Sequence, residues 1–227
     1  MIVAQRVFKL DYGASVIAGF SAGQANTVMV GIPMILAAFG EDGAVPLFML
    51  IAIHLPIMIS IATLLIEGRE AHLLRVLAKL THNPIVVSIL AGGAARLIGY
   101  SPDGFIKVFI DMLAQTGVPC ALFAMGVALH RYGLEEGSAL PTFLTAMKLI
   151  FHPLLVLIFA RYVFTMPPAW SGVAVLFAAC PCGVNAYLFA ERYKTGAGVA
   201  SSAIALSTAL SVVTSVFWLW ALGVTIK

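Results

Sequence analysis

The chain has 227 residues, of which 61% are hydrophobic and only 10% are charged. A soluble domain carries about 25% charged residues, so this composition excludes an ordinary soluble protein and predicts a surface that faces lipid. The formal net charge of +3 is spread along the chain without a basic block. We therefore expect the lipid bilayer as a partner and no nucleic acid.

Apolar segments of membrane-spanning length recur along the whole chain. A bilayer core about 30 Å thick requires roughly 20 apolar residues per helix. We therefore predict an all-α membrane protein with about seven transmembrane helices. These cover residues 12–39, 45–66, 83–98, 105–129, 140–164, 170–190 and 197–222. Residues 67–82 form an amphipathic stretch, which we expect to lie on the membrane surface.

The positive charges between the spans predict an orientation. Alternating sides puts eight Lys and Arg residues on the side of the N-terminus and four on the other. The first group is Arg6, Lys9, Arg69, Arg75, Lys79, Arg131, Arg192 and Lys194, and the second is Arg96, Lys107, Arg161 and Lys227. Positive loops stay in the cytoplasm. The N-terminus of this chain and residues 67–82 are thus expected inside, and the C-terminus outside.

Two of the predicted spans contain helix breakers and amides. Gly31 and Pro33 are expected to break the first, within residues 21–42, and Pro181 and Gly183 the second, within residues 178–198. Backbone groups freed by a break must be satisfied inside protein or beside a water-filled cavity. Broken helices at matching positions of two halves indicate a transporter site, although Gly and Pro also occur in ordinary membrane helices. The predicted substrate-binding residues here are Asn26, Gly31, Pro33, Pro181 and Asn185.

Ionisable residues inside the spans are the other candidates. Lys148 lies within residues 140–164, where an unpaired charge costs several kcal/mol, so we predict that it attracts an anionic substrate. His152 is one helical turn further on, and its residue type is expected to titrate near neutral pH. Asp111 lies in the fourth span and can pair with either Lys148 or Lys107. We interpret His152 and Asp111 as candidate coupling groups.

Several motifs in this order resemble the auxin efflux carrier family, which includes plant carriers and bacterial organic-acid permeases. They are NTVMVGIP at 26–33, NP at 83–84, PCALFAMGVAL at 119–129, KLIFHP at 148–153 and ACPCGVNAYLFAERY at 179–193. The resemblance implies ten helices in two inverted repeats of five, with two broken helices that cross at mid-membrane. It also implies a multi-pass protein of the bacterial cytoplasmic (inner) membrane.

The resemblance leaves the first three helices of that fold without a counterpart. Residues 12–66 are then expected to form the last two helices of the first repeat, residues 67–82 a cytoplasmic connection, and residues 83–222 a complete second repeat. A version of the fold without its first three helices lacks part of the scaffold on which the family moves.

The combined interpretation is a secondary transporter that moves a small organic anion, such as a carboxylate, by alternating access. The alternative is a truncated, non-transporting remnant or an assembly subunit of such a carrier. We expect no enzyme activity, because neither GxSxG nor HExxH occurs in the sequence. No cofactor or metal is expected. Coupling to H⁺ or Na⁺ and assembly as a homodimer stay open.

Overall fold

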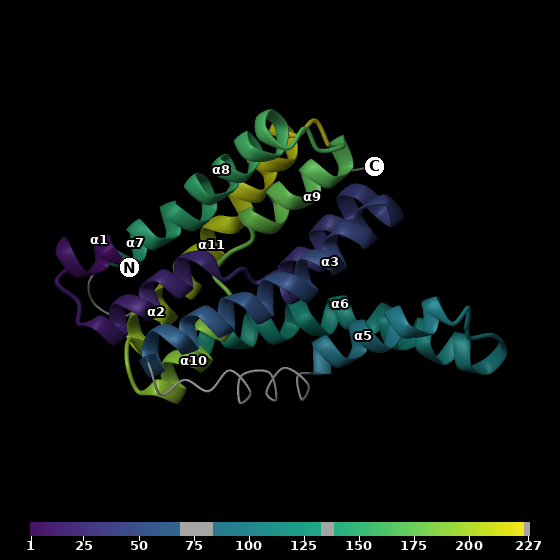
Figure 1. Ribbon diagram of the computed structural model, residues 1–227, viewed down its shortest axis with the longest axis horizontal. Helices are drawn as coiled ribbons and strands as arrows, with labels where there is room; N and C mark the ends of the chain where they lie inside the picture. The colour runs from purple at the N-terminus through teal and green to yellow at the C-terminus, as the bar shows by residue number, and fades with distance from the viewer. Residues whose placement is uncertain (69–83, 133–138, 225–227) are drawn as a thin grey trace.

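A computed structural model of the protein describes residues 1–68, 84–132 and 139–224. The regular elements of these residues are all helices (Figure 1), which confirms the predicted all-α class. In chain order they are α1 (Ile2–Arg6), α2 (Tyr12–Gly23), the π-helix η1 (Thr27–Gly31), α3 (Ile32–Glu67), α5 (Pro84–Leu97), α6 (Gly104–Tyr132), α7 (Ala139–Ala146), the π-helix η3 (Met147–Phe151), α8 (His152–Ile158), the π-helix η4 (Phe159–Val163), α9 (Pro168–Ala179), α10 (Asn185–Tyr193) and α11 (Ala197–Ala221).

Three helical stretches of the described chain are long and apolar enough to cross a membrane. They cover Thr27–Glu67, Ala139–Val163 and Ala197–Ala221, and Pro168–Ala179 is a shorter apolar helix. The protein is therefore an all-α membrane protein. The total of seven spans and the inverted repeat stay predictions, and most of the expected surface helix, residues 69–82, lies outside the described residues.

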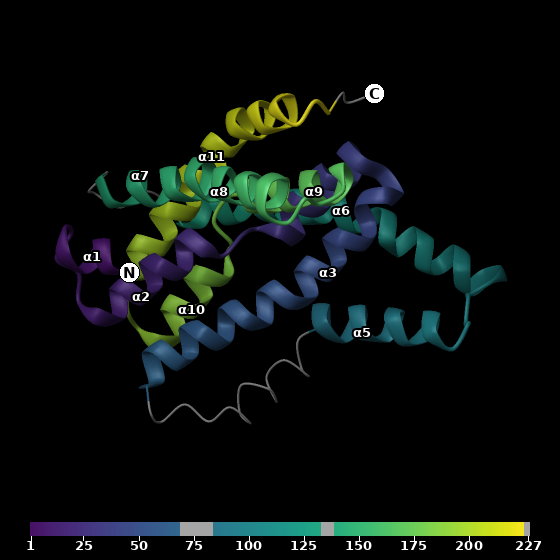
Figure 2. The ribbon, with the colours of Figure 1, turned by 45° about the horizontal axis from the view of Figure 1, so that its top comes forward.

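The helix α3 consists of two helical stretches that meet at Gly40. This glycine has φ 57° and ψ −138°, a conformation that a residue with a Cβ rarely adopts. The chain turns back across the molecule at this point (Figures 1 and 2). Residues before and after the turn, Ile35 and Leu47, are buried in the same hydrophobic cluster. The first two predicted spans therefore meet at Gly40.

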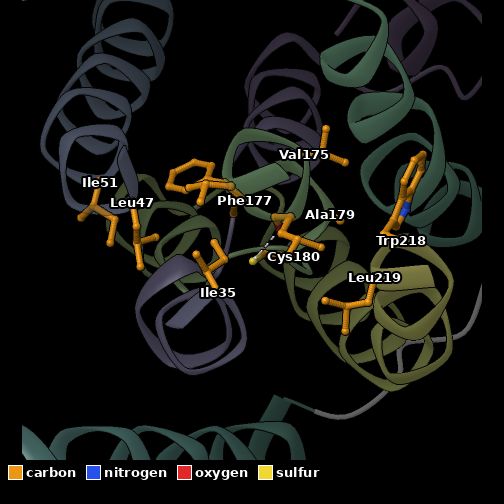
Figure 3. Packing of buried hydrophobic residues seen from close by; sticks show 12 residues of the cluster. Ile35, Leu47, Ile51, Val175, Phe177, Ala179, Cys180, Trp218 and Leu219 are labelled. Carbon is orange, nitrogen blue, oxygen red and sulfur yellow. Dashed lines mark hydrogen bonds between the residues drawn. The ribbon is translucent and has the colours of Figure 1, made fainter. Parts of the chain in front are cut away.

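The short helix α9 forms the centre of the bundle. Figure 3 shows its side chains Val175 and Phe177 between Leu47 of α3 on one side and Trp218 of α11 on the other. The hairpin of α5 and α6 extends away from this core at the end where the two helices meet (Figures 1 and 2), whereas α6 also contacts η1 and α11. Its apolar side chains, such as Phe105, are largely exposed, as expected for surfaces that face lipid or another protein segment in a membrane.

Two of the π-helices end two residues before a proline. η1 is followed by Pro33 and η3 by Pro153. Proline has no N–H and cannot donate the usual bond to the carbonyl four residues earlier. For Pro153 that carbonyl belongs to Leu149. The indole Nε1 of Trp218 donates to it at 2.8 Å, so a side chain of α11 replaces the bond that the proline removes.

Polar and charged side chains lie at the two ends of the helical bundle. Tyr193, at the end of α10, donates a hydrogen bond to Glu67, at the end of α3. Burial and this carboxylate raise the pKa of Tyr193, so the hydroxyl keeps its proton at neutral pH. At the other end, Arg161, Phe39 and Val224 line one cavity. The compartment that each end faces stays a prediction.

We predict that Trp218→Phe destabilises the protein by about 1–2 kcal/mol, because the Leu149 carbonyl loses its indole donor in a buried position. The measurement is the melting temperature in detergent. Trp220→Phe is the matched control, since Trp220 lies on the same helix with 76% of its surface exposed, against 3% for Trp218. Equal melting temperatures for the two variants would contradict the prediction.

Candidate functional site

The first break lies earlier in the chain than the sequence predicted. Helix α2 ends at Gly23, and Gln24 has an extended backbone with ψ 122°. The break covers residues 24–26, whereas Gly31 has helical φ and ψ and Pro33 lies in the first turn of α3. The prediction that Gly31 and Pro33 break the helix is therefore wrong. The π-helix η1 places a proline after a wider turn, so Pro33 is accommodated without ending the helix.

The second break lies where the sequence placed it. Helix α9 ends at Ala179, Cys180 has an extended backbone with ψ 146°, and α10 begins at Asn185. Pro181 and Gly183 both lie between the two helices, so the prediction of a break at these residues is confirmed. The helix α10 then continues to Tyr193.

The two breaks cross each other and exchange backbone hydrogen bonds. The Asn26 N–H donates to the Pro181 carbonyl at 2.8 Å, and the Gly183 N–H donates to the Gln24 carbonyl at 2.9 Å. The pair Ala25 and Cys182 thus forms an isolated antiparallel bridge. Each break thus supplies one donor and one acceptor to the other, which satisfies part of the backbone that the interrupted helices leave unpaired.

Glycines allow the two breaks to approach this closely. A Cβ on Gly183 would lie 2.9 Å from Gln24 Cγ and 3.0 Å from the Ala25 carbonyl oxygen. A Cβ on Gly31 would lie 3.1 Å from the Cys180 sulfur. The function of Gly31 and Gly183 in the structure is therefore close packing of the crossing rather than conformational freedom, since neither has a positive φ.

Side chains from other helices complete the second break. The Ser207 hydroxyl of α11 accepts a hydrogen bond from the Cys182 N–H at 3.0 Å. Lys148 of η3 is fully buried, and its Nζ donates to the Ala178 carbonyl at 2.7 Å. Ala178 lies in the last turn of α9, where carbonyls have no helical partner and the helix dipole is negative. The lysine thus places a positive charge at the end of this half-helix.

A cavity of about 140 Å³ lies at the crossing. It brings together two predicted site residues, Asn26 and Asn185. Its full lining is Gln24, Ala25, Asn26, Thr27, Val28, Met29, Leu55, Gly183, Val184 and Asn185. The other predicted residues, Gly31, Pro33, Pro181 and Lys148, lie outside this lining and instead shape or brace the crossing.

Both asparagines stand at the beginning of a helix. Asn26 is the N-cap of η1, and Asn185 is the first residue of α10. The first N–H groups of a helix have no helical partner, and the dipole is positive at this end. The cavity is therefore bordered by two helix N-termini and by the amide residues Gln24, Asn26 and Asn185, an arrangement that suits an anion.

Two histidines lie near Lys148 inside the bundle. His152 Nδ1 lies 3.3 Å from the Lys148 Nζ, and His54 of α3 is the other histidine near Lys148. The His54 ring packs edge-on against Phe177, with ring centroids 5.2 Å apart. The sequence favoured a structural role for His54, beside Pro56 in the second span. Only the folded bundle brings these side chains together.

Asp111 lies away from Lys148 and the two histidines. It forms an ion pair with Lys107 one turn earlier on α6, and both side chains are at least half exposed. Of the two pairings that the sequence left open, the structure has the one with Lys107. In the described part of the chain, no group of three or more His, Cys, Asp or Glu residues lies close enough to hold a metal ion. Coupling to H⁺ or Na⁺ stays a prediction.

Comparisons with known proteins agree with this architecture. The family model described as "Membrane transport protein" matches residues 71–219. The chain is 31% identical over 203 residues to the "Putative malonate transporter" of Rhizobium meliloti, which covers 86% of this chain and 63% of that protein. It is 28% identical over 138 residues to "Auxin efflux carrier component 1" of Arabidopsis thaliana, covering 58% of this chain and 22% of that protein.

Apolar helices that are interrupted and cross beside a cavity are typical of membrane transport proteins. The chain belongs to the auxin efflux carrier family, as the matched model and the two relatives show. The chain spans less than two thirds of the length of these relatives. The activity of the whole protein is therefore a proposal.

We predict that Gly183→Ala forces the two breaks apart. The added Cβ would lie closer than van der Waals contact to Gln24 Cγ and to the Ala25 carbonyl oxygen. Overpacking of this kind costs about 1–3 kcal/mol. The measurement is the melting temperature in detergent. Gly92→Ala on α5 is the control, because a Cβ there meets no atom within 4 Å. A Gly183→Ala protein as stable as the control would show that the crossing is loosely packed.

Proposed function

We propose that this protein is a secondary transporter that moves a small organic anion, such as a carboxylate, across the membrane by alternating access. One observation carries the proposal: Asn26 and Asn185, from two broken helices far apart in the sequence, border the same cavity. The membership in a family of membrane transport proteins supports it. So does the name of the Rhizobium meliloti relative, which refers to malonate.

The chemistry of the cavity favours an anion over a cation. Amide N–H groups of Asn26 and Asn185 and the helix N-termini that they begin offer hydrogen-bond donors and positive dipole ends. The lining in the described chain contains no Asp or Glu. A carboxylate that leaves water here exchanges its hydration for donors that are already in place, which lowers the cost of desolvation.

Lys148 has two effects in this proposal: it supplies a positive charge, and it stabilises the end of α9. Its ammonium neutralises the negative end of that half-helix by binding the Ala178 carbonyl. Its charge, on a fully buried side chain, also makes the interior of the bundle more positive. We propose that Lys148 draws the anion toward the crossing and holds the second break in shape, without lining the cavity itself.

We predict that Asn26→Ala and Asn185→Ala each weaken transport more than they reduce the amount of folded protein. Each removes an amide that contacts the proposed anion, at a cost of ~1–3 kcal/mol in binding if the partner group is left unpaired. Initial uptake of a radiolabelled dicarboxylate into proteoliposomes measures transport, and fluorescence-detected chromatography measures folding.

Thr214→Val is the control for this pair, because its exposed hydroxyl bonds the Leu210 carbonyl on α11 far from the cavity lining. Normal transport by both asparagine variants would place the substrate elsewhere. A parent protein that folds but transports no organic anion would contradict the proposed function and favour the non-transporting alternative.

We predict that Lys148→Met lowers both the melting temperature and the transport rate. The Ala178 carbonyl loses a charge-assisted bond, worth about 1.5–3 kcal/mol, and the bundle loses its central positive charge. Lys148→Gln separates the two effects, since it keeps an N–H donor, one bond shorter, without the charge. We expect it to recover part of the melting temperature but not the transport.

Lys107→Met is the matched control for Lys148→Met, because Lys107 lies exposed on α6 with its own partner Asp111. Unchanged transport by Lys148→Met would remove the charge from the mechanism. Recovered transport in Lys148→Gln would leave Lys148 with a structural role alone.

A further inference from the structure

Backbone hydrogen bonds hold Gln24 in the crossing, and the stem of its side chain lies beside Gly183. The Gln24 N–H donates to the Phe20 carbonyl at 2.7 Å, and the Gln24 carbonyl accepts from the Gly183 N–H at 2.9 Å. These bonds attach the residue to α2 on one side and to the second break on the other. The fold therefore fixes the position of Gln24 through its backbone, and these bonds do not use the amide group of its side chain.

The Gln24 amide carries an acceptor without a partner. The side chain lines the crossing cavity, and the residue is only 2% exposed. Its Oε1 is buried and has no hydrogen-bond partner among the described residues. Its Nε2 lies 3.4 Å from the Ala25 carbonyl oxygen. If the amide were rotated by half a turn, Oε1 would replace Nε2 beside the Ala25 carbonyl oxygen, and two acceptors would face each other. The Ala25 carbonyl therefore favours the orientation in which Oε1 points away from it.

A buried acceptor of this kind is costly until it receives a donor. A simple carboxylate cannot supply one, because an ionised carboxyl group has only acceptor oxygens. A carboxylate that also carries an O–H group can bind both ways. Its carboxylate accepts from the helix N-termini and asparagine amides, and its hydroxyl donates to Gln24 Oε1.

We propose that Gln24 is a specificity-determining residue, which selects small carboxylates that carry an O–H donor over those that do not. The inference rests on the proposed function and names its substrate class. Two kinds of acid share this chemistry: a hydroxy acid, and a dicarboxylic acid with one carboxyl group still protonated. A site that hydrogen-bonds a substrate hydroxyl discriminates strongly against the analogue without it.

The size of the cavity also favours a small acid. Its volume of about 140 Å³ is well below the ~300–1,000 Å³ of pockets for drug-sized molecules. A compact acid of a few carbon atoms suits this volume. In such an acid the O–H group lies close to the carboxylate, as Gln24 and Asn26 lie close together on the wall of the cavity.

The test compares lactate with propionate, which differ by one hydroxyl group. The purified protein is titrated with each acid, and the rise in melting temperature gives its Kd. We expect lactate to bind at least about tenfold more tightly than propionate. Gln24→Met, of similar length but without polar atoms, is expected to reduce this preference to about twofold or less, with no loss of melting temperature, since it removes an unpaired buried acceptor.

Gln115→Met is the control, because Gln115 is exposed on α6 and should keep the full preference for lactate. Malonate distinguishes the two kinds of donor. If a protonated carboxyl group is the donor, malonate binding weakens as the pH rises through the second pKa of the acid. Lactate binding does not weaken over the same range. The pH dependence of malonate binding is expected to disappear in Gln24→Met.

The outcomes separate this inference from the proposed function. Equal binding of lactate and propionate by the parent protein, or an undiminished preference in Gln24→Met, would overturn the role of Gln24 and leave the anion carrier intact. If none of the three acids binds and none is taken up into proteoliposomes, the proposed function fails as well. A Gln24→Met protein that no longer folds is replaced by Gln24→Leu in the same titration.

Discussion

The fold depends on one constraint, which is that peptide groups freed inside a membrane must find partners within the protein. Each such group costs several kcal/mol in hydrocarbon if it is left unpaired. Two helices of this protein are interrupted, and the interruptions satisfy each other through the bonds of Asn26 to Pro181 and of Gly183 to Gln24. The Ser207 hydroxyl accepts from the Cys182 N–H of the second break, and Lys148 donates to the Ala178 carbonyl just before this break. The crossing is thus a shared solution for two unstable segments.

The same constraint explains why a lysine is tolerated at the centre of the bundle. An ammonium group there would be costly alone, but the end of α9 offers a carbonyl without a helical partner and a negative dipole. Each of the two groups would be unfavourable without the other. The Leu149 carbonyl near Pro153 is handled in a similar way, by the indole of Trp218. Side chains of η3 and α11 therefore tie these helices to the core at points where the backbone is incomplete.

These ties also have consequences for the proposed transport cycle. The crossing joins α2, α9, α10 and α11 through bonds that involve both backbone and side chains. Separating any one of them would expose several polar groups at once. Alternating access would therefore move the crossing as a unit, with the anion held at its cavity, rather than open one helix at a time. The exposed apolar surfaces of the α5 and α6 hairpin lie outside this unit.

The sequence by itself determined the class of protein, because composition and span length follow directly from the thickness and polarity of the bilayer. It also located the second break, at Pro181 and Gly183. It misplaced the first break, because a π-helix before Pro33 absorbs the proline and the residues that do leave the helix, Gln24 to Asn26, include no helix breaker.

The tertiary structure decided the partners, which are set by packing between segments far apart in the chain. The pairing of Lys148 with Ala178, of Asp111 with Lys107 and of Trp218 with Leu149 all depend on which helix faces meet. The unpaired Oε1 of Gln24 is likewise invisible in the sequence. An amide in a membrane span signals that a partner is needed, but only the arrangement of the surrounding helices determines whether the protein supplies it.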